Sequence, residues 1–265
     1  MHVARELWTL YEPIHSVTYF APEAKAAYEA VGLRGYWRGY FAGRAAPLGP
    51  VGPAPVLAAF YGFAPSMVER ALPDVWSRAT PEVTLEARRT GAVEALTNLL
   101  DGADVTEAVE LVERAVSQLD HSGHVLGAAY ASVEMPEDEP LARLWHACGV
   151  LREHRGDGHV AALVAYDLTG IESLVFRASI DIPREWLQQF RGWTDEEWEA
   201  AHERLAARGA LGDRDLLDAI EAATDRAAVR AWDGIDVDRV REVLTPLSKA
   251  AGHVLPPVTP LGLPR

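Results

Sequence analysis

Cysteine and lysine are nearly absent from this chain of 265 residues. The single Cys148 cannot form an intramolecular disulfide or a cysteine zinc cluster, a usage typical of a reducing compartment such as the cytoplasm. Because Lys25 and Lys249 are the only lysines, nearly all positive charge is arginine, which can bind a carboxylate or phosphate through two parallel hydrogen bonds. The sequence also lacks a basic-then-apolar signal peptide and any apolar run near the roughly 18 residues that a membrane span needs. We therefore expect a cytoplasmic protein without a membrane partner.

Positive charge as a whole is in deficit. Asp and Glu number 39 against 25 Lys and Arg, which gives a formal net charge of -14. Such a surface repels a phosphate backbone, so nucleic acid is not an expected partner. With 49% hydrophobic and 24% charged residues, the composition is that of an ordinary globular protein of one or two domains.

A stripe of glycines marks the early part of the chain. The pattern predicts helix between residues 22 and 44, broken or bent at Gly32. After that point Gly35, Gly39 and Gly43 are four residues apart on one face. Three glycines inside a helix cost about 2–3 kcal/mol relative to alanine, so the missing side chains must serve a purpose. Either another element approaches closely, or a flat ligand lies along the groove.

The most informative feature is a weak internal repeat. Residues 37–44 align with residues 145–152, tryptophan over tryptophan and arginine over arginine. Four more blocks follow in the same order: 56–61 with 160–165, 66–71 with 172–178, 80–82 with 194–196, and 104–110 with 215–221. The order predicts a duplication. The alternative is that amphipathic helices rich in Ala, Leu and Glu align tolerably with one another.

We predict an all-α fold, with at most short wing strands, made of two winged-helix-like units that form a pseudo-dimer. The first unit covers residues 1–125, and the second covers 126–265 and ends in an extended tail from Gly252. Thr194 begins a helix in the second unit, Gly209 ends it, and another helix follows over residues 213–230. The three residues between these helices are too few for the strands of a wing. Residues 120–140 are expected to be a surface connection.

Four segments resemble a family of high-GC bacterial proteins known as SalK-like and related to helix-turn-helix proteins. They are residues 12–20 (EPIHSVTYF), 32–49 (GLRGYWRGYFAGRAAPLG), 152–160 (REHRGDGHV) and 191–198 (RGWTDEEW). The resemblance spans nearly the whole chain. It implies a winged-helix or MarR-like ancestry, in which one chain holds two units and imitates the dimer of a regulator.

Residues 152–159 place six ionisable side chains in eight positions. One interpretation is structural: a solvated loop, in which Gly156 stops one helix and the next residue caps the following helix. The other is functional: the loop opens onto a cleft between the units, where an imidazole transfers protons and a carboxylate orients it. The candidate acid–base residues are Glu153, His154, Asp157 and His159.

Arginines near the glycine stripe suit an anionic ligand. Arg34 and Arg38 are one turn apart and could clamp an anion, although salt bridges to neighbouring glutamates explain them equally well. If the repeat reflects a pseudo-twofold axis, Arg44 and Arg152 face one shared cleft. His15 and Trp37 could also be ordinary core residues. The predicted ligand-binding residues are His15, Tyr19, Arg34, Trp37, Arg38, Arg44, Arg152 and Arg155.

No cofactor motif is found. His154 and His159 lack the spacing that pairs two imidazoles on a helix face, and there is no Cys-x-x-Cys-His for haem attachment. Phosphate-loop, dinucleotide and Gly-x-Ser-x-Gly signatures are absent as well. We expect no cofactor; a divalent metal gathered with His15 or His146, or a haem, is the alternative.

The function favoured by the sequence is binding of an anionic, partly aromatic metabolite between the two units, with acid–base catalysis by the residues named above. Such an enzyme would be a cofactor-independent isomerase, lyase or hydrolase, and whether the chain catalyses at all stays open. The alternatives are a carrier and a ligand-responsive MarR-like transcription regulator. In the regulator Arg204 and Arg208 would reach DNA, although five carboxylates share their helix. A monomer or a homodimer is expected.

Overall fold

Helices form all the regular structure of residues 1–256, the part of the chain that the computed structural model describes, and no strand occurs among them. The predicted all-α fold is therefore confirmed. Several helices begin where a short polar side chain accepts a hydrogen bond from the first turn, as at Thr80, Thr169, Thr194, Asp213 and Asp236. The helix predicted to begin at Thr194 has a complete capping box, and Gly209 after it adopts a positive φ of 66°.

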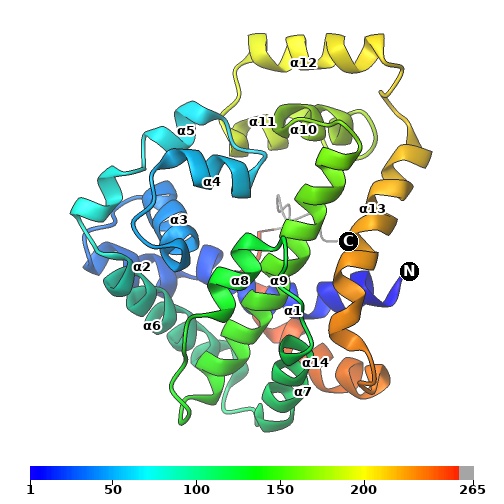
Figure 1. Ribbon diagram of the computed structural model, residues 1–265. Helices are drawn as coiled ribbons and strands as arrows, with labels where there is room; N and C mark the ends of the chain where they lie inside the picture. The colour runs from blue at the N-terminus through cyan, green and yellow to red at the C-terminus, as the bar shows by residue number, and fades with distance from the viewer. Residues whose placement is uncertain (257–265) are drawn as a thin grey trace.

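The helices follow one another with short connections (Figure 1). The N-terminal half contains α1 (Val3–Phe20), α2 (Pro22–Ala30), α3 (Tyr36–Ala45), α4 (Pro53–Phe60), α5 (Pro65–Glu69), α6 (Pro81–Leu100), α7 (Thr106–Ser117) and α8 (Val125–Ala131). The C-terminal half contains α9 (Pro140–Ala165), α10 (Gly170–Ala178), α11 (Arg184–Arg191), α12 (Asp195–Ala207), α13 (Arg214–Val229) and α14 (Val237–Ala251). Short 3-10 turns are η1 (Ala46–Leu48), η2 (Asp74–Ser77), η3 (Arg230–Trp232) and η4 (Gly252–Val254).

The long helix α9 runs through the middle of the molecule and packs against α1, α6, α7, α8 and α13 (Figure 1). The predicted loop at residues 152–159 is therefore wrong, because these residues lie in the middle of the continuous helix α9. The charged side chains tolerate burial because each has partners on a neighbouring helix. Gly156 does not stop the helix, and Asp157 caps a different helix, as described below.

The apolar core has three clusters. The first joins α1, α6, α7 and α14 to the N-terminal half of α9. The second is built from α2 to α5 with Ala87 and Leu126, and the third joins the C-terminal end of α9 to α10–α13. The first cluster takes side chains from both sides of residue 125, so the predicted units share their main core. The boundary between the units and the duplication stay predictions. The first pair of aligned blocks differs in structure: α3 ends shortly after residues 37–44, whereas α9 continues well beyond residues 145–152.

The first and last long helices lie against each other. Arg241 of α14 donates to both carboxylate oxygens of Glu6 on α1, at 2.6 and 2.9 Å. Leu7 and Ile14 of α1 and Leu244 and Leu247 of α14 belong to the same cluster. The two ends of the chain thus close one core.

Two expected connections differ from the structure. The predicted surface connection over residues 120–140 contains α8, whose Leu126 and Tyr130 are buried. The predicted extended tail begins as the 3-10 turn η4, and its residues 257–265 lie outside the described part.

The glycine stripe has a structural explanation. A Cβ atom at Gly39 or Gly43 would lie 2.9 or 2.0 Å from the Tyr28 ring and hydroxyl, so these glycines let α2 and α3 approach each other through that tyrosine. Gly35 is not part of the stripe, because it precedes α3 with a φ of 87°.

Two glycines of α9 test the continuity of that helix. A Cβ atom at Gly156 meets nothing closer than 3.9 Å, so Gly156→Ala is expected to raise the free energy of unfolding by up to about 1 kcal/mol. A Cβ atom at Gly158 lies 2.7 Å from the Cβ of Ala227 on α13, so Gly158→Ala is expected to lower it by about 1–3 kcal/mol. Urea unfolding followed by circular dichroism measures both. Destabilisation by Gly156→Ala would contradict an unbroken α9.

Candidate functional site

A group of ionisable side chains is buried where α1, α3, α6, α8 and α9 meet. We call it the central polar cluster; its members are Glu12, His15, Tyr19, Arg44, Arg88, Tyr130, Arg152 and Glu153. Five of them were predicted from the sequence: His15, Tyr19, Arg44 and Arg152 as ligand-binding residues, and Glu153 as an acid–base residue. Arg44 and Arg152 both contact Glu153, and the shared ligand cleft predicted for them stays a prediction.

Glu153 lies at the centre of the cluster. Arg44 of α3 donates Nε to Oε1 at 3.0 Å and Nη2 to Oε2 at 2.9 Å, which is the bidentate geometry of a strong ion pair. Arg152 approaches the same Oε1 atom with Nη1 at 2.8 Å. Although burial opposes ionisation, these two guanidinium groups hold the pKa of Glu153 below its ordinary range. Glu153 is therefore a fixed anion and cannot release or take a proton near neutral pH.

The second carboxylate, Glu12, is occupied as well. It accepts hydrogen bonds from Trp8 Nε1 at 2.9 Å and from Ser16 Oγ at 3.1 Å, and Arg152 Nε lies 3.6 Å from its Oε1. Arg152 thus sits between the two carboxylates of the cluster.

Among residues 1–256, no carboxylate pairs with Arg88 of α6. Its side chain is only 2% exposed, yet Nε has no hydrogen-bond partner and Nη2 reaches only His15 Nε2 at 3.5 Å. Aromatic rings surround the guanidinium, at 4.9 Å for Tyr130, 5.1 Å for Trp145 and 6.0 Å for Tyr19. Burial raises the pKa of Tyr19 and Tyr130, so both are neutral and neither compensates the charge. Face-on aromatic contact is favourable but does not replace a counterion.

His15 is neutral beside this arginine. Burial and the nearby Arg88 hold its pKa well below the ordinary value. Nε2 lies 3.2 Å from the Tyr19 hydroxyl and faces Arg88, which can only donate; the ring proton is therefore assigned to Nδ1. Nδ1 is buried against Gly149 without a hydrogen-bond partner.

The cluster consequently holds more positive than negative charge. Arg44, Arg88 and Arg152 face two carboxylates. Arg191 of α11 is partly buried nearby, 4.5 Å over the Phe63 ring, and adds a further positive charge for which the described residues provide no acidic partner. An unpaired ion in a dry interior costs several kcal/mol. Such a surplus favours the uptake of an anion.

A small cavity opens beside the cluster, between α1, α2 and α3. Its volume is about 30 Å³. Buried residues Thr18, Tyr19 and Tyr28 line its floor, whereas exposed Lys25 and Tyr36 form part of its rim. Tyr19 and Tyr28 also neighbour Arg88, so the cavity and the unpaired charge share two walls.

A larger hollow of about 260 Å³ lies between the end of α6 and the start of α9. Its walls are mainly apolar, such as Leu96, Leu100 and Leu141, and Asp104 is its one charged residue. It therefore has nothing that would select an anionic ligand.

The other predicted acid–base residues have partners outside the cluster. His154 stacks on His124 at 3.7 Å between ring centres, and its Nε2 lies 3.1 Å from the Asp120 carbonyl oxygen. Asp157, one turn further along, accepts a hydrogen bond from the backbone N–H of Gly127 at 2.8 Å and so caps α8. His154 and Asp157 thus both face α8, whereas His159 Nδ1 lies 3.0 Å from the Thr224 hydroxyl of α13. Because no hydrogen bond joins any two of these three side chains, a shared proton relay has no geometric support.

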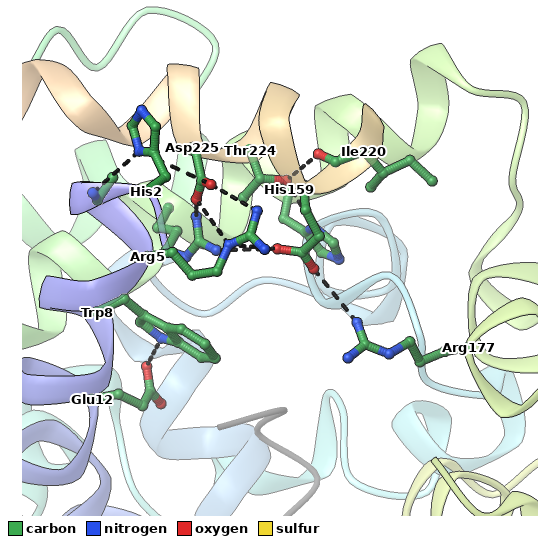
Figure 2. A network of polar contacts seen from close by, with 12 residues as sticks. His2, Arg5, Trp8, Glu12, His159, Arg177, Ile220, Thr224 and Asp225 are labelled. Atoms are coloured by element: carbon green, nitrogen blue, oxygen red, sulfur yellow. Dashed lines mark hydrogen bonds and ion pairs between the residues drawn. The ribbon is translucent and has the colours of Figure 1, made fainter. Parts of the chain in front are cut away.

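Arg155 belongs to a second network, which ties α9 to α1 and α13 (Figure 2). Asp225 of α13 accepts from Arg5 at 2.7 Å and from Arg155 at 3.2 Å. Arg177 reaches Glu221 at 3.5 Å, and Arg155 lies 5.1 Å over the Trp8 ring. Arg177 also donates to Asp181 at 2.6 Å, so three arginines face three carboxylates and the network is balanced in charge.

The remaining predicted ligand residues lie outside the cluster. Arg34 and Arg38 are exposed, and Arg38 donates only to the Arg34 carbonyl at 3.3 Å. Trp37 packs at the edge of the second apolar cluster, against Phe41 and Phe63. The three side chains therefore do not form the predicted clamp and wall.

Sequence reasoning missed Arg88 and Thr18. A signal for Arg88 was present, because Thr84, Arg88, Gly91 and Ala95 recur at helical spacing and form the buried face of α6. An arginine within a stripe of small residues has no solvent to reach. Thr18 carries no comparable signal.

Among the described residues, no group of three or more His, Cys, Asp or Glu side chains is placed to hold a metal ion. Within the same residues no single helix is long and apolar enough to span a membrane; α9 and α10 meet the length and hydropathy criteria only together, across a bend of 89°.

The Asp157 cap predicts a pH-dependent stability. Burial raises the pKa of Asp157 to about 6, from 3.8 in the unfolded chain, so its negative charge costs stability above about pH 6 and this cost disappears as the pH falls toward 4. Asp157→Asn removes the charge and keeps an oxygen that can accept from Gly127. We expect it to be about 1–2 kcal/mol more stable than wild type at pH 7.5, with the gap closing between pH 6 and 4 in thermal unfolding. Asp157→Ala, which loses the hydrogen-bond acceptor, is the control. A stability difference between Asp157→Asn and wild type that does not change with pH would contradict the raised pKa of Asp157.

Comparison with known proteins gives one match. A family model described as a helix-turn-helix family matches residues 4–256. No curated protein and no solved structure matches the chain. Since the family model covers nearly the entire sequence, including α3, α6 and α9 of the central polar cluster, the chain belongs to this helix-turn-helix family.

Proposed function

We propose that this protein binds a small anionic metabolite in the central polar cluster. The observation that carries the proposal is Arg88, a fully buried guanidinium without a carboxylate partner. The positive field of Arg44, Arg152 and Arg191 adds to it, since Glu153 and Glu12 compensate only two of the four charges. A bound anion would offset part of this surplus.

The proposal is limited to binding. Glu153 is a fixed anion, and His154, Asp157 and His159 have separate structural partners. The SalK-like and MarR-like relationship suggested by the sequence motifs also favours ligand binding, because dimeric regulators of that ancestry hold small ligands between their units.

A charge-to-apolar substitution tests the role of Arg88. If its charge is uncompensated in the free protein, Arg88→Met leaves the melting temperature unchanged or raises it. The same variant loses the stabilisation by anions, which for wild type at 100 times Kd amounts to about 2.7 kcal/mol. Thermal unfolding with and without chloride, phosphate, acetate and benzoate measures both effects.

The matched control is Arg114→Gln, at an exposed arginine on α7, which is expected to respond to anions as wild type does. The proposal is wrong if Arg88→Met is strongly destabilised and none of the four anions raises the melting temperature of the wild type. Arg88 would then be a packing residue.

A DNA-binding regulator is the second candidate, and the helix-turn-helix family match favours it. Against it, the two arginines expected to reach DNA from α12 are already paired: Arg204 donates to Glu172 at 2.8 Å and Arg208 to Asp167 at 3.0 Å. Contacts with phosphates would have to break both pairs.

Fluorescence anisotropy with double-stranded DNA at low salt decides between the candidates. We expect no binding at about 10 μM protein, because the surface carries excess negative charge. The affinity for DNA would then be lower than is usual for nonspecific binding at low salt. Binding that weakens steeply with salt and is lost in Arg204→Gln would favour the regulator instead.

A further inference from the structure

The cavity beside the central polar cluster has an unused hydrogen-bonding group on its floor. Thr18 is 2% exposed, lines the cavity, and its Oγ1 atom has no hydrogen-bond partner. A buried hydroxyl without a partner costs about 1–3 kcal/mol. A group that accepts a hydrogen bond at this point would remove that cost.

A second unpaired hydroxyl lies on the arginine's own helix. Thr84 is fully buried one turn before Arg88 on α6, and its Oγ1 atom also lacks a partner. The Tyr28 side chain stands next to Thr18 and Arg88 and lines the cavity as well. Thr18 and Tyr28 therefore line the end of the cavity that lies nearest Arg88. Arg88 and Thr84 stand behind this wall and do not line the cavity, whereas the exposed Glu29, which pairs with Lys25 at 3.8 Å, lines its outer part.

The rest of the cavity is aromatic. Tyr19, Tyr28, Tyr36 and Tyr40 line it, and the rings of Tyr36 and Tyr40 stack at 6.1 Å between centres with an interplanar angle of 21°. Tyr36 is 42% exposed at the rim, in contrast to the buried floor. A ligand entering here meets ring faces first and the polar end last.

We propose that the ligand is an aromatic monocarboxylic acid of the benzoate class. Its carboxylate lies at the floor, where the Thr18 hydroxyl donates to it. Arg88, behind the wall formed by Tyr19 and Tyr28, supplies the opposite charge, and the ring of the ligand lies nearer the rim against Tyr36 and Tyr40. This inference rests on the proposed function and names the ligand class. A volume of about 30 Å³ suits the carboxylate end alone.

Calorimetric titration of the full chain with benzoate, acetate, benzamide and inorganic phosphate tests the class. Benzoate is expected to bind at least about 10-fold more tightly than acetate, because the aromatic walls bury its ring. Benzamide is expected not to bind, because it lacks the charge. Thr18→Val is expected to weaken benzoate binding roughly 10–100-fold, the usual loss for a hydrogen bond to a charged group. Thr18→Ser, which restores the hydroxyl, recovers the affinity, and Arg114→Gln leaves it unchanged.

The outcomes separate the two proposals. If acetate or phosphate binds as tightly as benzoate and Arg88→Met abolishes that binding, the aromatic ligand class is overturned while anion binding stands. If benzamide binds as well as benzoate, or Thr18→Val binds benzoate as wild type does, the carboxylate position is wrong. If no anion binds the wild type, both proposals fall.

Discussion

The interior of this protein depends on the carboxylate of Glu153. It joins α3 to α9 through Arg44 and at the same time neutralises part of the charge of Arg152 on its own helix. Low dielectric makes these contacts strong, and the same low dielectric makes an unpaired member costly, with losses of about 3–5 kcal/mol when one partner of such a pair is removed. The helices around α9 can therefore pack in only one register, the one that brings these partners together.

The two polar networks along α9 contrast in their charge balance. On the side of α13, Arg5, Arg155 and Arg177 each form an ion pair with Asp225 or Glu221, so every arginine of this network has a carboxylate partner. On the side of α6, Arg88 meets only aromatic rings and a neutral imidazole. One side resembles a joint between helices. The other has the uncompensated charge on which we base the proposed anion site, whereas the density of charged residues is similar on both sides.

Much of the fold followed from local signals. Caps such as Thr194 and Asp213 begin helices where expected, because they act within a few residues. Residues 152–159 were misassigned for the opposite reason. Glycine and charge favour a loop locally, and a buried helix is stable there only because partners distant in the chain, such as Arg44 and Asp225, compensate its charges. Five members of the central polar cluster were identified from the amino-terminal motif, the charged segment 152–159 and the repeat. The buried position of Arg88 could have been read from the small residues that share its face of α6, but its lack of a partner is a property of the packed interior.

The contact between α1 and α14 has a consequence for biosynthesis. Leu7 and Ile14 of α1 are synthesised long before the side chains of α14 that cover them. Until α14 has been made, this apolar stripe lacks part of its cover, and contacts between residues so far apart in sequence form slowly. A nascent chain would thus keep this core incomplete, and open to chaperones and proteases, until α14 has left the ribosome.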